Sequence, residues 1–238
     1  MILRTLACLA SISAASVAAA QCRQALALGL DVSGSVDARE YRLQLDGLGA
    51  ALGSDPVRQA LLALPKAPVD LLVYEWSGPG DVHLILPWTS VTSDLDLNEV
   101  IATLRATERR ETSPGTALGS AMRLGYEYLK ERSACWKLTL DLSGDGKSNL
   151  GPRPKDVKET LQDTGITINA LVIGADAPSI GDLRQAEIAE LTSYFRANVI
   201  LGKDAFVEAA LGFEDYPEAM ARKLEKELNT VVISGQSR

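Results

Sequence analysis

Residues 26–35 read Leu-Ala-Leu-Gly-Leu-Asp-Val-Ser-Gly-Ser, an apolar run that ends at an aspartate followed by two serines at alternate positions. A short apolar run of this kind predicts a buried strand. Asp31, Ser33 and Ser35 offer one carboxylate and two hydroxyls, which are hard oxygen donors suited to a divalent cation, and Gly34 allows a tight turn between them. An alternative is that these residues cap a helix, since Ser and Asp are preferred caps.

Apolar runs typical of strands alternate along the whole chain with segments of helical periodicity. The residues between 76 and 82, Ser-Gly-Pro-Gly-Asp, form so short a connection that the two strands beside them must make a hairpin. The expected strands are 26–30, 69–76, 82–88, 137–142, 166–173 and 198–201, and the expected helices are about 38–53, 118–129, 156–164 and 183–192, with a last helix broken near Pro217. The pattern predicts an α/β fold: a Rossmann-like, doubly wound, mostly parallel six-stranded sheet with one antiparallel edge strand and helices on both faces.

The first twenty residues have the pattern of a secretory signal peptide. Arg4 supplies a positive charge, residues 6–17 are apolar, and three alanines before Gln21 form a small-residue cleavage site. The apolar stretch is too short to span a bilayer comfortably. We therefore expect residues 1–20 to be removed and residues 21–238 to form one domain, secreted or periplasmic, without stable membrane insertion.

The charge of the chain limits its partners. The formal net charge is −7, and loss of Arg4 with the leader makes it −8 for the remaining 218 residues. An acidic protein of this kind is a poor match for nucleic acid or anionic lipid. The length is sufficient for one domain with a large buried core.

Two cysteines remain after the leader, and their positions predict a disulfide. Cys22 stands nine residues before Asp31, and Cys135 stands ten residues before Asp145. If the two aspartates end neighbouring parallel strands, the cysteines meet at the opposite edge of the sheet, and thiols tend to pair in an oxidising compartment. The alternative is two unrelated thiols.

Two more loops bring oxygen donors to the edge where parallel sheets bind ligands. Thr116 lies just before the helix expected from residue 118, and Asp145 lies between two glycines after the strand expected at 137–142. Three hydroxyls and two carboxylates around one point suit an octahedral divalent cation, Mg²⁺ first and Mn²⁺ or Ca²⁺ as alternatives. So few charged ligands leave a coordination position for a carboxylate from outside.

These motifs resemble the von Willebrand factor A domain and its metal-ion-dependent adhesion site (MIDAS). The resemblance extends to an uncharacterised bacterial branch of that superfamily, a domain of unknown function, through the segments 75–78, 87–89, 141–146, 165–171 and 202–228. It implies the same fold and a metal site formed by Asp31, Ser33, Ser35, Thr116 and Asp145. It implies no substrate or partner.

Asp141 departs from the apolar pattern of the strand in which it is expected. Burying an unpaired carboxylate is costly, so this side chain needs a partner. Our hypothesis is that it accepts hydrogen bonds from backbone amides or hydroxyls behind the metal loops and supports them. The alternative is that a twist of the strand exposes it.

The favoured function is an exported module that holds a divalent cation and uses it to bind an exposed carboxylate of a protein partner. No catalytic residue is assigned, because a nucleophilic serine needs a base and His83, the one histidine, is expected in the edge strand. A metal-dependent hydrolase acting on phosphoesters is the alternative, with Asp141 or Glu75 as its base. A purely structural domain is a third possibility.

Overall fold

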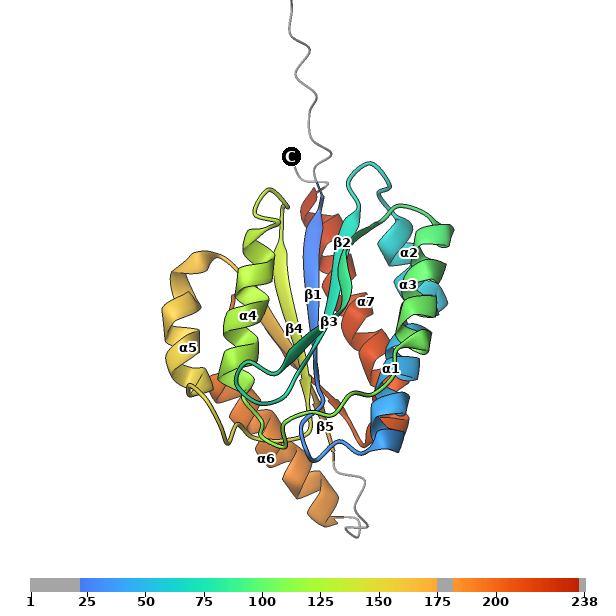
Figure 1. Cartoon of the computed structure of the whole chain (residues 1–238). Coiled ribbons are helices and arrows are strands. Elements are labelled where there is room, and N and C mark those ends of the chain that lie inside the picture. Colours follow the sequence, from blue (N-terminus) through green and yellow to red (C-terminus); the bar gives the residue numbers. More distant parts are fainter. Residues whose placement is uncertain (1–21, 175–181, 236–238) are drawn as a thin grey trace, which may run out of the picture.

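The computed structural model describes residues 22–174 and 182–235, so the predicted signal peptide lies outside the described residues (Figure 1). Six strands in this part of the chain form one sheet in the order β3-β2-β1-β4-β5-β6. The pairing of β3 with β2 is antiparallel and the other pairings are parallel. The strands are β1 (Gln24–Asp31), β2 (Val69–Trp76), β3 (Val82–Val91), β4 (Leu138–Gly144), β5 (Thr167–Ile173) and β6 (Val207–Ala210). The predicted α/β fold with one antiparallel edge strand is confirmed.

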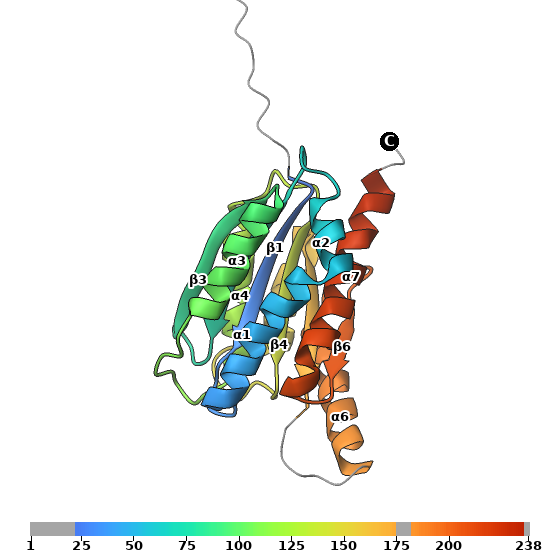
Figure 2. The same cartoon turned by 90° about the vertical axis from the view of Figure 1, so that its right-hand side faces the viewer.

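Helices cover both faces of this sheet and make a three-layered molecule (Figures 1 and 2). One face carries α1 (Ala38–Gly53), α2 (Asp55–Leu62), α3 (Asp94–Ala106) and α7 (Tyr216–Gly235), and the other carries α4 (Leu118–Lys130), α5 (Pro154–Leu161) and α6 (Asp182–Asn198). Each face has its own cluster of buried apolar side chains. None of the described helices is long and apolar enough to cross a membrane.

Helix α1 has the bounds that its periodicity predicts. Tyr41, Leu45 and Leu48 are buried against the sheet, as the three- and four-residue spacing requires. The helix begins after Asp37, whose carboxylate accepts hydrogen bonds from the amides of residues 39 and 40, while Glu40 bonds back to the Asp37 amide. This reciprocal capping fixes where α1 begins and where the loop of residues 32–36 after β1, called the metal loop below, ends.

Helices α2 and α3 are absent from the sequence-based prediction, although both carry recognisable start signals. Ser93 accepts a hydrogen bond from the Asp96 amide, and the Asp96 carboxylate accepts one from the Ser93 amide, which is a capping box. Helix α2 has Pro56 in its first turn, where the missing amide hydrogen costs nothing. Both helices cover the same face as α1.

The predicted sixth strand at 198–201 is wrong. Asn198 is the last residue of α6, and Leu201 makes only an isolated antiparallel bridge to Ile168. Gly202 then adopts a φ of +109°, which ends the extended run, and the true edge strand β6 starts at Val207. Pro217 likewise does not break a helix, because α7 begins at Tyr216 and the proline lies in its first turn.

The predicted disulfide is confirmed, since Cys22 is bonded to Cys135. β1 and β4 are neighbouring parallel strands, so their starts lie side by side at one edge of the sheet. Asp31 and Asp145 come at the opposite ends of the same two strands. The bond therefore closes the edge of the sheet that lies away from the candidate site.

Candidate metal centre

Asp31 is the last residue of β1, and its side chain is buried. The Ser33 amide donates to Asp31 Oδ1 at 2.9 Å, and Gln44 Nε2 of α1 donates to the Asp31 carbonyl oxygen at 3.0 Å. The other carboxylate oxygen, Oδ2, is buried and has no hydrogen-bond partner within the described chain. A buried, unpaired carboxylate oxygen is costly unless a cation occupies the space beside it.

Hydroxyl groups from two loops form a continuous chain next to this carboxylate. Thr116 Oγ1 lies 3.1 Å from Ser33 Oγ, and Ser33 Oγ lies 3.3 Å from Ser35 Oγ. Ser35 Oγ donates to Asp145 Oδ1 at 2.8 Å, which links the loop after β1 to the loop after β4. Thr116 and Ser33 are buried, and Ser35 is exposed at the rim. The fold thus brings together residues from three separate loops.

The two carboxylates of this group influence each other. Burial, and then the charge of Asp145, raise the pKa of Asp31 to about 8. Burial also raises the pKa of Asp145, against the hydrogen bond from Ser35. Asp31 Oδ2 lies beside Gly144, where a side chain would come within 3.3 Å of it. A neighbouring carboxylate disfavours the charged form of Asp31, which is the effect that Asp145 has here.

The donor set fits a hard divalent cation. Three hydroxyl and two carboxylate oxygens lie along one rim, with one buried carboxylate oxygen left unpaired. Mg²⁺ prefers octahedral oxygen ligation and usually retains water, which this number of protein ligands allows. We refer to Asp31, Ser33, Ser35, Thr116 and Asp145 as the candidate metal centre.

The alternative in which these residues cap a helix is wrong, because the cap of α1 is Asp37. Gly34 lies in the tight turn predicted for it, where the Val36 amide donates to the Ser33 carbonyl at 3.0 Å. Its φ is not positive, and a Cβ there would come within 3.0 Å of Pro114. Glycine is favoured because the loop before Thr116 packs closely against the metal loop, with the Gly34 amide donating to the Pro114 carbonyl at 3.1 Å.

Two residues that position Thr116 were overlooked in the sequence. The Asn149 side-chain oxygen accepts a hydrogen bond from the Thr116 amide at 2.9 Å, and the Asn149 amide donates to the Thr116 carbonyl at 3.0 Å. Ser148 Oγ donates to the same carbonyl at 3.1 Å. Asn149 stands four residues after Asp145 and Ser148 stands three after it, and this position was their only signal in the sequence. They tie the Thr116 loop to the loop after β4.

The partner of Asp141 is a lysine, not the backbone amides or hydroxyls of our hypothesis. Asp141 is buried and forms an ion pair with Lys223 of α7, which is also fully buried. Lys223 Nζ donates to Glu227 at 2.6 Å, and Asn169 Nδ2 donates to the same Glu227 oxygen at 2.6 Å. The carboxylate therefore faces the helix layer rather than the metal loops. One cation is shared by two buried carboxylates.

This sharing predicts a pH-dependent stability that a single substitution should weaken. Burial, and then the charge of Glu227, raise the pKa of Asp141 from 3.8 to about 7. Between these two pKa values, from about pH 4 to pH 7, the folded state holds a proton that the unfolded chain has released. The free energy of unfolding therefore falls as pH rises through this range, by at most about 1.4 kcal/mol per pH unit for this group. Glu227→Gln leaves one carboxylate for one lysine, so we expect a shallower decline.

Urea unfolding from pH 4 to 8 with EDTA present measures this difference. Asp31 and Asp145 also have raised pKa values, but both proteins contain them, so their contribution cancels in the comparison. Parallel curves of unfolding free energy against pH for wild type and Glu227→Gln would contradict the shared proton.

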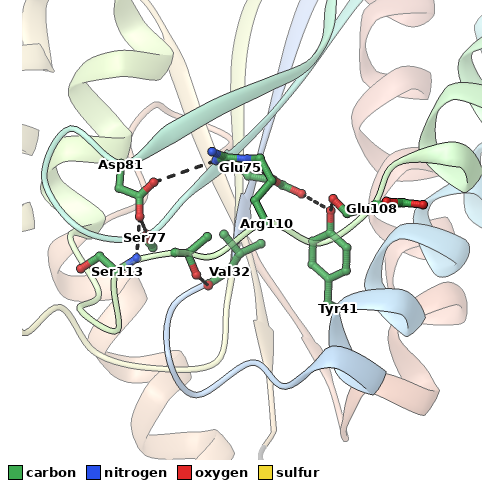
Figure 3. A network of polar contacts seen from close by, with 9 residues as sticks. Val32, Tyr41, Glu75, Ser77, Asp81, Glu108, Arg110 and Ser113 are labelled. Carbon is green, nitrogen blue, oxygen red and sulfur yellow. Dashed lines mark hydrogen bonds and ion pairs between the residues drawn. The ribbon is translucent and has the colours of Figure 1, made fainter.

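Glu75, the other base that a hydrolase would require, is buried at the end of β2 and engaged by a tyrosine (Figure 3). Tyr41 of α1 donates its hydroxyl hydrogen to Glu75 Oε1, and its oxygen also lies 3.3 Å from the Glu108 carbonyl. Burial raises the pKa of Glu75 against this hydrogen bond. Both candidate bases are therefore committed to neighbouring side chains.

A protein-family comparison matches residues 21–232 to a family described as a protein of unknown function, DUF1194. Comparison with functionally curated proteins finds no match.

Solved structures with the same fold include several proteins of low sequence identity. The proximal thread matrix protein 1 of the mussel byssus, titled as having a zinc-occupied MIDAS motif, is 17% identical with a TM-score of 0.58, covering 88% of this chain and 48% of that one. The pilus adhesin SpaC of Lactobacillus rhamnosus GG is 12% identical with a TM-score of 0.56, covering 89% and 31%. A von Willebrand factor type A protein from Catenulispora acidiphila is 11% identical with a TM-score of 0.56, covering 88% and 43%. This chain spans less than half the length of each.

Proposed function

The chain belongs to the DUF1194 family and has a von Willebrand factor A-like fold, and from this premise we propose that it is an exported binding module. It holds a divalent cation at the candidate metal centre and uses that cation to bind an acidic group of a protein partner. Residues 21–238 form the single mature domain, and residues 1–20 form its signal peptide.

The observation that carries the proposal is the buried Asp31 carboxylate, whose Oδ2 has no partner in the described residues and which is followed in the same loop by hydroxyls linked to Thr116. Asp31 and Asp145 would supply the charge that holds the cation, and the three hydroxyls would supply neutral ligands. A bound divalent ion would offer a Lewis-acidic position to an oxygen of the partner. Mg²⁺ is the ion that this oxygen set suits best, with Mn²⁺ and Ca²⁺ as alternatives.

Further observations support binding outside the cytoplasm. The Cys22–Cys135 disulfide is typical of oxidising compartments. Two proteins of similar fold are titled a pilus adhesin and a thread matrix protein. The engagement of Glu75 by Tyr41 and of Asp141 by Lys223 favours a binding role over hydrolysis, which needs a free base near the ion.

Metal binding is tested by isothermal titration of the purified protein with Mg²⁺, Mn²⁺ and Ca²⁺. We expect Asp31→Asn to lower the affinity for the preferred ion at least about tenfold, because the substitution removes one of two negative ligands. Asp37→Asn makes the same change of charge two residues beyond Ser35, preserves a capping side chain, and should bind metal like wild type. Equal heats from Asp31→Asn and wild type would refute the assigned centre.

Recognition of acidic groups is tested with a capped peptide of six aspartates. We expect it to bind in Mg²⁺ and to be released by EDTA. Binding that survives both EDTA and the Asp31→Asn substitution would refute the proposed function.

A further inference from the structure

The loop of residues 107–114, between α3 and α4, lies against the metal loop and is tied to it twice. Thr112 Oγ1 donates to the Val32 carbonyl at 2.9 Å, and the Gly34 amide donates to the Pro114 carbonyl at 3.1 Å. Val32 and Gly34 flank Ser33, one of the hydroxyl ligands of the candidate metal centre. The position of this loop is therefore coupled to the rim where a partner would bind.

An open cavity of about 500 Å³ lies at this junction. Its lining residues are Gly34, Arg109, Arg110, Glu111, Thr112 and Pro114. Because Gly34 stands between the two serines of the metal loop, the cavity adjoins the candidate metal centre. Two guanidinium groups and one carboxylate line it, so its lining carries a net positive charge within an acidic protein.

Arg110 is already engaged by the protein. Its Nε lies 3.9 Å from Glu75 Oε2 and its Nη2 lies 3.9 Å from Asp81 Oδ1 (Figure 3). Asp81 is itself held by Ser77 Oγ at 2.8 Å and by the Ser113 amide at 2.6 Å. Arg110 therefore fixes the loop over the β2–β3 hairpin.

Arg109 differs from its neighbour. Its guanidinium carbon lies 5.8 Å from the centre of the Tyr41 ring, and that ring is buried and held by the hydrogen bond to Glu75. Within the part of the chain that the structure describes, the guanidinium makes no hydrogen bond or ion pair. A cation–π contact with a buried aromatic ring orients an arginine while leaving its N–H donors free for an anion.

We propose that Arg109 binds a second anionic group of the partner, beside the carboxylate that the candidate metal centre takes, so that the preferred ligand is a polypeptide segment with closely spaced acidic residues. This inference rests on the proposed function. A planar guanidinium forms paired, charge-assisted hydrogen bonds with a carboxylate, which provides selectivity for multiply acidic ligands. The carboxylate of Glu111, which lines the same cavity, repels such a ligand and limits its affinity.

Two capped hexapeptides test the proposal by titration in Mg²⁺, one of six aspartates and one with a single aspartate among serines. We expect Arg109→Gln to weaken the six-aspartate peptide about fivefold and to leave the single-aspartate peptide unchanged. Glu111→Gln should strengthen the six-aspartate peptide, because it removes a like charge. Lys66→Gln is the control: this exposed lysine precedes β2 at the opposite edge of the sheet, and its loss changes net charge equally.

The outcomes separate the inference from the proposed function. If Arg109→Gln binds both peptides as Lys66→Gln does while EDTA still releases them, the inference fails and the proposed function stands. An equal loss for both peptides would also overturn the inference, because Arg109 would then act on the metal centre itself. If EDTA has no effect on wild type, the proposed function fails. Tight binding of a heparin hexasaccharide through Arg109, without binding of the six-aspartate peptide, would assign the surface to sulfated glycans and overturn the proposal.

Discussion

Lys223→Met is expected to lower the free energy of unfolding by about 3–5 kcal/mol, the usual cost of removing one partner from a buried ion pair. Lys223 is fully buried between α7 and the sheet, and its ammonium group contacts both Asp141 and Glu227. Methionine fills most of the same space, so the packing of the stem is retained. The fall in the free energy of unfolding therefore measures the cost of burying two carboxylates with no cation beside them.

Urea unfolding at pH 7.5 of wild type, Lys223→Met and Lys226→Met provides the measurement. Lys226 lies one turn along the same helix, exposed over the Phe206 ring at 3.8 Å, so its replacement should cost about 1 kcal/mol or less. Adding Asp141→Asn to Lys223→Met should recover part of the stability, because one of the stranded charges is removed. A loss from Lys223→Met no larger than that from Lys226→Met would contradict the buried charge cluster.

Removal of the disulfide is expected to have an effect of similar size. Cys22 and Cys135 are separated by 113 positions in the sequence. The chain-entropy model assigns about 4.7 kcal/mol to a loop of 100 residues, and measured losses of native disulfides are about 2–5 kcal/mol. We expect a Cys22→Ala and Cys135→Ala double variant to lose stability within that range, because the unfolded chain becomes freer.

Dithiothreitol provides an internal control for this measurement. Reduced wild type should unfold at nearly the same urea concentration as the double variant, whose own midpoint should not respond to the reductant. The metal affinity should change little, since the bond lies at the edge of the sheet away from Asp31. An unchanged midpoint in the double variant would show that the bond does not constrain the unfolded chain.

Part of the candidate site could be predicted because each of its motifs is encoded by residues that are neighbours in the sequence. The apolar run that ends at Asp31 marks a strand end by itself. The two serines that follow are recognised as candidate ligands by their alternate spacing. The bounds of α1 follow from side-chain periodicity. The disulfide required one assumption, that Asp31 and Asp145 end adjacent strands, which the pairing of β1 with β4 confirms.

Other features were not readable from local pattern. The edge strand was placed at 198–201 because that run is apolar, whereas the backbone of Gly202 ends the extended segment and β6 forms from residues of mixed polarity. Helices α2 and α3 have short or weakly amphipathic sequences, and only their start signals marked them. A strand at an exposed edge carries little of the hydrophobic pattern on which the prediction depended.

The amino-acid sequence by itself predicted five of the six strands, the connecting hairpin and the five oxygen-bearing residues of the candidate metal centre, because strand ends and helix faces are encoded over a few neighbouring positions. Only the tertiary structure decided that Asp141 meets Lys223, that Asn149 holds Thr116, and that Arg109 lies over Tyr41 beside the metal loop. These pairs join elements far apart in the chain. Their physical reason is burial: once the layers pack, each enclosed charge or polar group must find a partner among whatever side chains the fold brings to it.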